Sequence, residues 1–181
     1  MRLWGFLLAG FILIVEATAS DNPPLRKLSF TVSPLWAIAG IGDLSVEYRP
    51  VFSWGVVGNT MLGEFNLDSY RGKSSDDGTF HVGGVQLRRY LNPGGSHLAG
   101  EVSYWRIDAD AASSGGIEGR VEQWRAGALM GYKTISRVGM TLDIQGGAYY
   151  ALRHYKSGAE SGFGDPPRVG PIVRVNLGWS F

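Results

Sequence analysis

Charged side chains recur along this chain inside stretches where apolar and polar residues alternate, and they are its first candidates for chemistry. The candidates are Glu47, Arg49, Arg88, Glu101, Arg125, Asp143, Arg153 and Arg174. Charges of both signs that share an apolar setting must pair and form hydrogen bonds, since a buried ion left alone costs several kcal/mol. The set predicts either a polar plug that holds neighbouring strands in register or a narrow ion path, and we favour the plug.

Catalytic and metal-binding patterns are not found in the sequence. His81, His97 and His154 have no metal-ligand spacing, and none of them has a serine two positions away. The run from Ser74 to Gly78 lacks the alternating acidic ligands of a calcium loop, and there is no cysteine for a thiolate site. We therefore expect no enzyme activity, no catalytic residue, no metal site and no cofactor, and a lipid-modifying enzyme that uses His81 or His154 is the least favoured alternative.

The overall composition narrows the class of protein. The formal net charge is +1 and the basic residues are scattered, which argues against nucleic-acid binding. Beyond the first twenty residues no stretch is long and apolar enough for a membrane-spanning helix. The 12% aromatic content and 27 glycines are typical of β-barrels with aromatic girdles and crowded interiors.

The N-terminal segment has the features of a secretory signal peptide. Arg2 gives a positive start, an apolar run extends from Leu3 to Val15, and Ala17-Thr18-Ala19 is a small-x-small cleavage pattern. We expect cleavage after Ala19, so that residues 1–19 are the signal peptide. Residues 20–26 are then expected to be a flexible segment, and residues 27–181 a single barrel domain.

Period-two alternation along the rest of the chain predicts eight β-strands. It is clearest where Met140, Leu142 and Ile144 alternate with Thr141, Asp143 and Gln145. The eight predicted strands are Leu28–Ala39, Leu44–Arg49, Trp54–Leu62, Phe80–Leu91, His97–Ile107, Gln123–Ile135, Gly139–Tyr155 and Pro171–Phe181. Most are near the roughly 9 to 11 residues that a tilted transmembrane strand needs.

The lengths of the connections favour a membrane barrel over a soluble sandwich. Gly63–Thr79, Asp108–Glu122 and Lys156–Gly170 are long and hydrophilic, whereas 50–53, 92–96 and 136–138 are tight turns. Long loops at one rim and short turns at the other are the layout of outer-membrane barrels. Open sheet edges could not survive in lipid, so the strands must close into an all-β, eight-stranded, antiparallel up-and-down transmembrane barrel. The short first connection, 40–43, departs from the pattern.

Large aromatic residues near the ends of the strands are expected at the two membrane interfaces. They share the apolar parity, where amphipathic rings would form an aromatic girdle. The predicted girdle comprises Trp36, Trp54, Tyr104, Trp124, Tyr132 and Trp179.

Four segments carry a family resemblance: residues 44–50, 85–91, 131–133 and 175–181. They resemble small bacterial outer-membrane barrels, and most of all an uncharacterised family whose domain has no known function. The resemblance implies export to the outer membrane of a Gram-negative bacterium and insertion by the outer-membrane assembly machinery, which would read Phe181 as part of its signal. It transfers no catalytic residue.

The expected function is that of a non-enzymatic integral barrel with a side-chain-filled lumen, which we expect to be a monomer in the lipid bilayer and to act structurally or by binding through its outer loops. The alternative is a narrow channel or a conduit for small apolar molecules. Neither the ligand nor conduction follows from the sequence.

Overall fold

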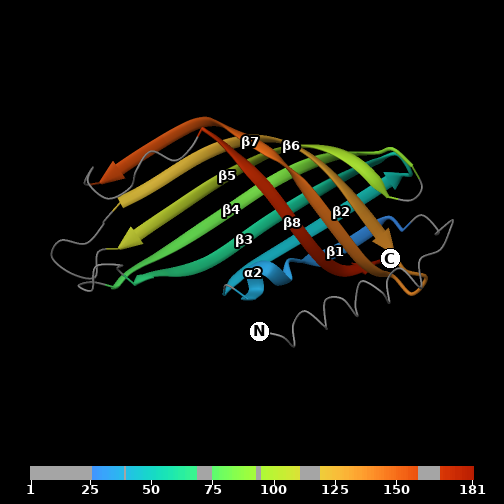
Figure 1. Cartoon of the computed structure of the whole chain (residues 1–181), viewed down its shortest axis with the longest axis horizontal. Coiled ribbons are helices and arrows are strands. Elements are labelled where there is room, and N and C mark those ends of the chain that lie inside the picture. Colours follow the sequence, from blue (N-terminus) through green and yellow to red (C-terminus); the bar gives the residue numbers. More distant parts are fainter. Residues whose placement is uncertain (1–25, 39, 69–74, 93–94, 111–118, 159–167) are drawn as a thin grey trace.

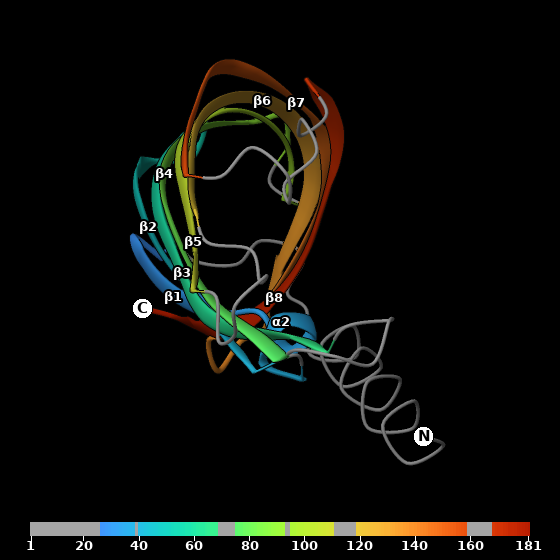
Figure 2. The ribbon, with the colours of Figure 1, turned by 90° about the vertical axis from the view of Figure 1, so that its left-hand side faces the viewer.

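The computed structural model describes residues 26–38, 40–68, 75–92, 95–110, 119–158 and 168–181. Eight antiparallel strands wind around a common axis as a closed barrel in which each strand pairs with its neighbours in sequence (Figures 1 and 2). The strands are β1 (Leu28–Val32), β2 (Ile41–Val51), β3 (Trp54–Asp68), β4 (Ser75–Tyr90), β5 (Ser96–Asp110), β6 (Gly119–Ile135), β7 (Met140–Gly158) and β8 (Val169–Ser180). The predicted closed eight-stranded barrel is confirmed.

Closure depends on the shortest strand, β1. On one side Leu28–Val32 pairs with Leu44–Tyr48 of β2, and on the other Ser29–Val32 pairs with Leu177–Ser180 of β8. The hydroxyl groups of Ser29 and Ser180 lie 2.7 Å apart across this seam, and that of Thr141 lies 2.6 Å from Ser180. Backbone and side-chain hydrogen bonds therefore join the two ends of the chain.

The period-two pattern separates the two faces of the barrel wall. In β2, Ser45, Glu47 and Arg49 are buried, while the alternating Leu44 and Tyr48 are exposed. The outward face carries exposed apolar side chains around the barrel, among them Val56, Val85, Leu87, Val102, Met130 and Val173. Leu142 is an exception, since it has outward parity but is buried. Among the described residues, no helix has the length and apolar character needed to cross a membrane.

The strands extend further than the sequence predicted. The ladder between β3 and β4 continues to the pair Asp68 and Ser75, and that between β5 and β6 to Ala109 and Gly119. The predicted boundaries of the long connections at Gly63–Thr79, Asp108–Glu122 and Lys156–Gly170 were therefore wrong. Polar residues there join the strands because cross-strand pairing satisfies their backbone groups. Residues 69–74, 111–118 and 159–167 of the long connections lie outside the described residues, as do residues 1–25 with the predicted signal peptide.

The first predicted strand, Leu28–Ala39, was wrong beyond Val32. A short helix, α2 (Pro34–Ile38), follows β1 and contacts β2 and β8. Pro34 favours this turn because the first helical position needs no N–H group. The amide of Ala37 donates to the carbonyl oxygen of Ser33 at 3.1 Å. The strand therefore ends early, and Trp36 lies on a helix instead of a strand.

The tight turn between β6 and β7 requires glycine at position 139, where φ is +107°. A Cβ atom there would lie 2.6 Å from Nε1 of Trp179 and 2.7 Å from the carbonyl oxygen of Ser180. We expect Gly139→Ala to lower the free energy of unfolding by about 1–3 kcal/mol through backbone strain, measured by urea titration of the folded protein. The control is Gly146→Ala, whose Cβ would meet no atom within 4 Å. Equal stability of the two variants would contradict this account.

Candidate functional site in the polar lumen

The inner ion cluster, which comprises Glu47, Arg88, Lys133 and Asp143, crosses the lumen. Nη1 of Arg88 lies 3.0 Å and Nζ of Lys133 lies 2.7 Å from Oε2 of Glu47, and the hydroxyl of Tyr90 donates to the same carboxylate. Nη1 of Arg88 also lies 2.8 Å from Oδ2 of Asp143. All four are buried. Two positive and two negative groups therefore neutralise one another where bulk water cannot solvate them.

Neutral side chains add further contacts to this cluster. Nε2 of Gln145 donates to Oδ2 of Asp143 at 2.7 Å, and Nε of Arg88 donates to Oε1 of Gln86. Nε2 of His97 lies 3.8 Å from Oδ1 of Asp143, while its Nδ1 lies 3.1 Å from the carbonyl oxygen of Gly95. Lys133 also donates to the hydroxyl of Ser29 at 2.7 Å, which ties the cluster to the closing seam.

A second ion pair joins β5 to β8. Both terminal nitrogens of Arg174 contact the Glu101 carboxylate, with Nη2 to Oε1 at 2.8 Å. The amide of Gln86 links this pair to the inner ion cluster, because its Nε2 lies 3.1 Å from Oε2 of Glu101 and 3.1 Å from Oε1 of Gln145. The two sets of charges thus form one network that connects strands on opposite sides of the ring.

Two inward arginines differ from the others because they stack on aromatic rings. The guanidinium carbon of Arg49 lies 3.7 Å from the ring centroid of Tyr90, and Nε of Arg49 donates to the carbonyl oxygen of Phe52. The guanidinium carbon of Arg125 lies 3.8 Å from the centroid of Trp105 and 4.2 Å from that of Tyr149. Such contacts attract a cation to the negative face of a ring.

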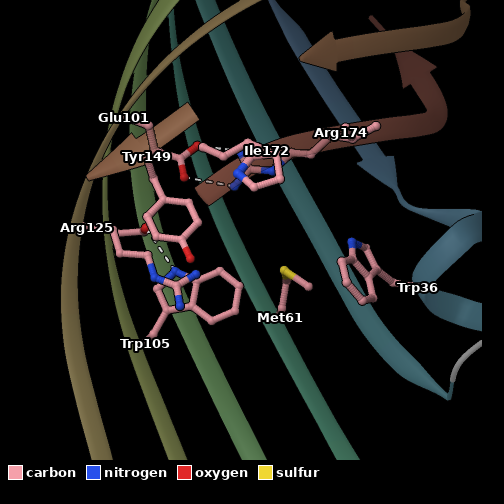
Figure 3. A pocket seen from close by; sticks show the side chains of 12 residues that line it. Trp36, Met61, Glu101, Trp105, Arg125, Tyr149, Ile172 and Arg174 are labelled. Carbon is pink, nitrogen blue, oxygen red and sulfur yellow. Dashed lines mark hydrogen bonds and ion pairs between the residues drawn. The ribbon is translucent and has the colours of Figure 1, made fainter. Parts of the chain in front are cut away.

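A cavity of about 90 Å³ lies in the lumen next to the Glu101–Arg174 pair (Figure 3). Arg125, Trp105 and Tyr149 lie on one side of it, Met61 and Ile172 lie near its middle, and Trp36 approaches from α2. The cavity therefore combines a cationic group, aromatic rings and aliphatic walls.

The sequence-predicted lumen residues occupy different parts of this arrangement. Glu47, Arg88 and Asp143 meet in the inner ion cluster, Glu101 pairs with Arg174, and Arg49 and Arg125 stack on aromatic rings. The side chain of Arg153 lies outside the described part of the chain. No group of three or more potential metal ligands occurs within the described residues.

The predicted aromatic residues are divided between the outside and the lumen. Trp54, Trp124, Tyr132 and Trp179 are exposed on the outward face, and Tyr104 lies half-buried there with its ring centroid 5.2 Å from that of Trp124. Trp36 is placed differently, because the helix α2 directs it to the cavity.

Sequence reasoning overlooked several lumen residues. Tyr90, His97 and Trp105 share the inward parity of Arg88 or Glu101, but aromatic side chains were assigned to the outward face or left unassigned. Their parity relative to the charged residues was the signal that could have placed them inside.

Comparisons with known proteins identify the fold. No family model matches the chain, and no curated protein matches it. Among solved structures, Ail, the attachment invasion locus protein of Yersinia pestis, in complex with the heparin analogue sucrose octasulfate, aligns with a TM-score of 0.50. The alignment covers 85% of this chain and 95% of Ail at 12% identity.

The chain shares the fold of Ail. A second Ail structure aligns with a TM-score of 0.47 and 11% identity over the same shares of the two chains. At such low identity the likeness to Ail establishes the barrel fold, and function has to be argued from the residues of this chain.

Removing the acid at the centre of the inner ion cluster tests how much the barrel depends on it. We expect Glu47→Gln to lower the free energy of unfolding by about 3–5 kcal/mol, because Lys133 loses its carboxylate partner inside the lumen. Urea titration followed by tryptophan fluorescence measures the change. Adding Lys133→Met should restore part of the loss by removing the unpaired cation.

The matched control is Glu64→Gln, which neutralises an exposed glutamate on β3. It should change the free energy of unfolding by no more than about 0.5 kcal/mol. If Glu47→Gln were equally harmless, the inner ion cluster would not stabilise the ring.

Proposed function

We propose that this chain is a non-enzymatic integral barrel of the bacterial outer membrane, whose polar lumen is a structural plug. The observation that supports this most is the inversion of the two faces: apolar side chains cover the outside, while Glu47, Arg88 and Asp143 are buried within. A soluble barrel would place its apolar side chains inside, where water cannot reach them. In lipid the same arrangement is favourable, and closure leaves few backbone groups unpaired.

The pairing of the lumen charges supports the proposal that the lumen is a structural plug. Arg88 lies between two carboxylates and Lys133 binds one of them, so these ions are held by one another across the lumen. Such a crossing network favours a sealed interior over the channel alternative. Phe181, directly after β8, is proposed as part of the signal for the outer-membrane assembly machinery, and the barrel is proposed to act as a monomer.

Binding is proposed for the outer connections. Together with the adjoining strand ends, these connections span residues 63–79, 108–122 and 156–170, which contain ten Asp and Glu residues against five Lys and Arg residues. Their charge favours partners with basic groups and disfavours polyanions. This differs from the neighbour Ail, which was crystallised with a heparin analogue.

Topology labelling tests the membrane location. The chain has no cysteine, so a single Ser113→Cys between β5 and β6, or Val138→Cys between β6 and β7, gives one reactive site. With a membrane-impermeant maleimide, Ser113→Cys should be labelled in intact cells and Val138→Cys only after the outer membrane is permeabilised. Recovery of the protein in the soluble fraction, or equal labelling of both sites in intact cells, would overturn the proposal.

The charge of the outer connections predicts no binding to heparin. The full chain in detergent micelles should flow through a heparin column at physiological ionic strength, because its outer segments repel sulfate groups. The variant Asp110→Lys/Glu118→Lys, which reverses one charge at the end of β5 and one between β5 and β6, serves as a positive control and should be retained longer. Strong retention of the unmodified chain would contradict an acidic binding surface.

A further inference from the structure

The barrel wall is interrupted on one side because β1 is much shorter than its two neighbours. β1 has 5 residues, whereas β2 has 11 and β8 has 12. The last β1 residue, Val32, pairs with Leu44 on one side and Leu177 on the other. Beyond it, α2 lies between β2 and β8 and contacts both. The part of the wall bounded by α2, residues 41–43 of β2 and residues 169–176 of β8, where β1 no longer pairs, is called the β8 notch.

The edge of β8 that borders the notch has no strand partner among the described residues. Leu28 and Phe181 exchange backbone hydrogen bonds, so every second residue back from Phe181 directs its backbone groups toward the side of β1. By the same alternation, the backbone groups of Val175, Val173 and Pro171 also face the side of β1. Proline has no N–H group and occurs in strands mainly at edges, so Pro171 suits an unpaired edge.

The lumen cavity reaches this edge. Pro171, Ile172, Val173 and Arg174 all line it, together with Trp36 of α2. Successive residues of a strand point to opposite faces, so a cavity confined to the lumen would touch only every second side chain. Contact with four consecutive residues places one end of the cavity at the β8 notch, where the side chain of Val173 is exposed.

At the other end of the cavity lies an arginine without a carboxylate partner. Among the described residues, Arg88, Lys133 and Arg174 each form an ion pair, but no carboxylate lies within 4.0 Å of the Arg125 guanidinium. Its Nε donates to Oε1 of Gln123, and its guanidinium group stacks on the rings of Trp105 and Tyr149. The terminal N–H groups donate to no described acceptor, and they suit the two oxygens of an anionic group.

We propose that the cavity binds the carboxylate end of a single-chain fatty acid, with the carboxylate at Arg125 and the alkyl chain passing Met61, Ile172 and Trp36 toward the β8 notch. The volume of about 90 Å³ is several times what a single buried water needs. It leaves room for a carboxylate and the methylene groups next to it. The remainder of the chain would then lie in the notch, against apolar side chains that face the lipid.

The test uses the full chain in phosphatidylcholine vesicles with 8-bromooctanoate, because bromine quenches nearby tryptophan fluorescence. We expect saturable quenching that requires at least about tenfold more ligand in Arg125→Gln, since a charged hydrogen-bonding group is lost. The matched control is Arg89→Gln, which removes an exposed arginine stacked at 5.0 Å on the outward Trp54. It should bind like the unmodified chain.

The orientation of the ligand is tested with two positions of bromine. Quenching by 8-bromooctanoate should fall most in Trp36→Phe, and quenching by 2-bromooctanoate should fall most in Trp105→Phe. The neutral 8-bromooctanol should bind at least about tenfold more weakly than the acid. Each variant is first checked for heat-modifiable gel mobility, so that failure to fold is recognised separately.

Three outcomes would overturn the proposal. They are quenching that does not saturate, equal binding by Arg125→Gln and Arg89→Gln, and equal binding of the acid and the alcohol. The first would mean that the ligand only partitions into the vesicle, and the other two that Arg125 does not bind its carboxylate. A folded and membrane-inserted protein that shows any of them would still be compatible with the proposed structural role of the barrel.

Discussion

The structure depends on one constraint: a narrow closed ring that turns its apolar side chains outward must accommodate its charged side chains within. Glu47, Arg88, Lys133 and Asp143 solve this by pairing across the lumen. Each ion alone would cost several kcal/mol, but the network satisfies the charges together. Since Lys133 also contacts Ser29 at the closing seam, the charge pairing and the closure of the ring stabilise the same part of the fold.

The sequence was sufficient for the ring and for the parity of its charged residues, because alternation is a local property. It could not specify which ions pair, since Glu47, Arg88 and Asp143 come from β2, β4 and β7 and meet only after the sheet has closed. The same limit applied to Trp105, whose inward position matters because Arg125 and Tyr149 approach it from two other strands. Trp36 was misplaced for a local reason, since the alternation rule was extended through Ser33-Pro34, where the chain turns into α2.

The early end of β1 has a consequence for the energetics of the wall. A strand that stops at Val32 leaves residues 169–176 of β8 without a described strand partner on the β1 side, and in lipid such unpaired backbone groups are costly. Two features reduce this cost: Pro171 contributes no donor, and α2 packs beside the edge. The wall is therefore continuous where the four β1–β8 pairs close it, and weaker where the cavity reaches β8.

The two arrangements of arginine in the lumen have different chemical consequences. Arg88 and Arg174 are neutralised by carboxylates and can do little except hold strands together. Arg125 is held by two aromatic rings, which fix the plane of the guanidinium but do not neutralise its charge. A cation that is oriented but not neutralised retains its attraction for an anion. Arg125 is thus able to bind an anionic ligand, and it lines the same cavity that reaches β8 on the interrupted side of the wall.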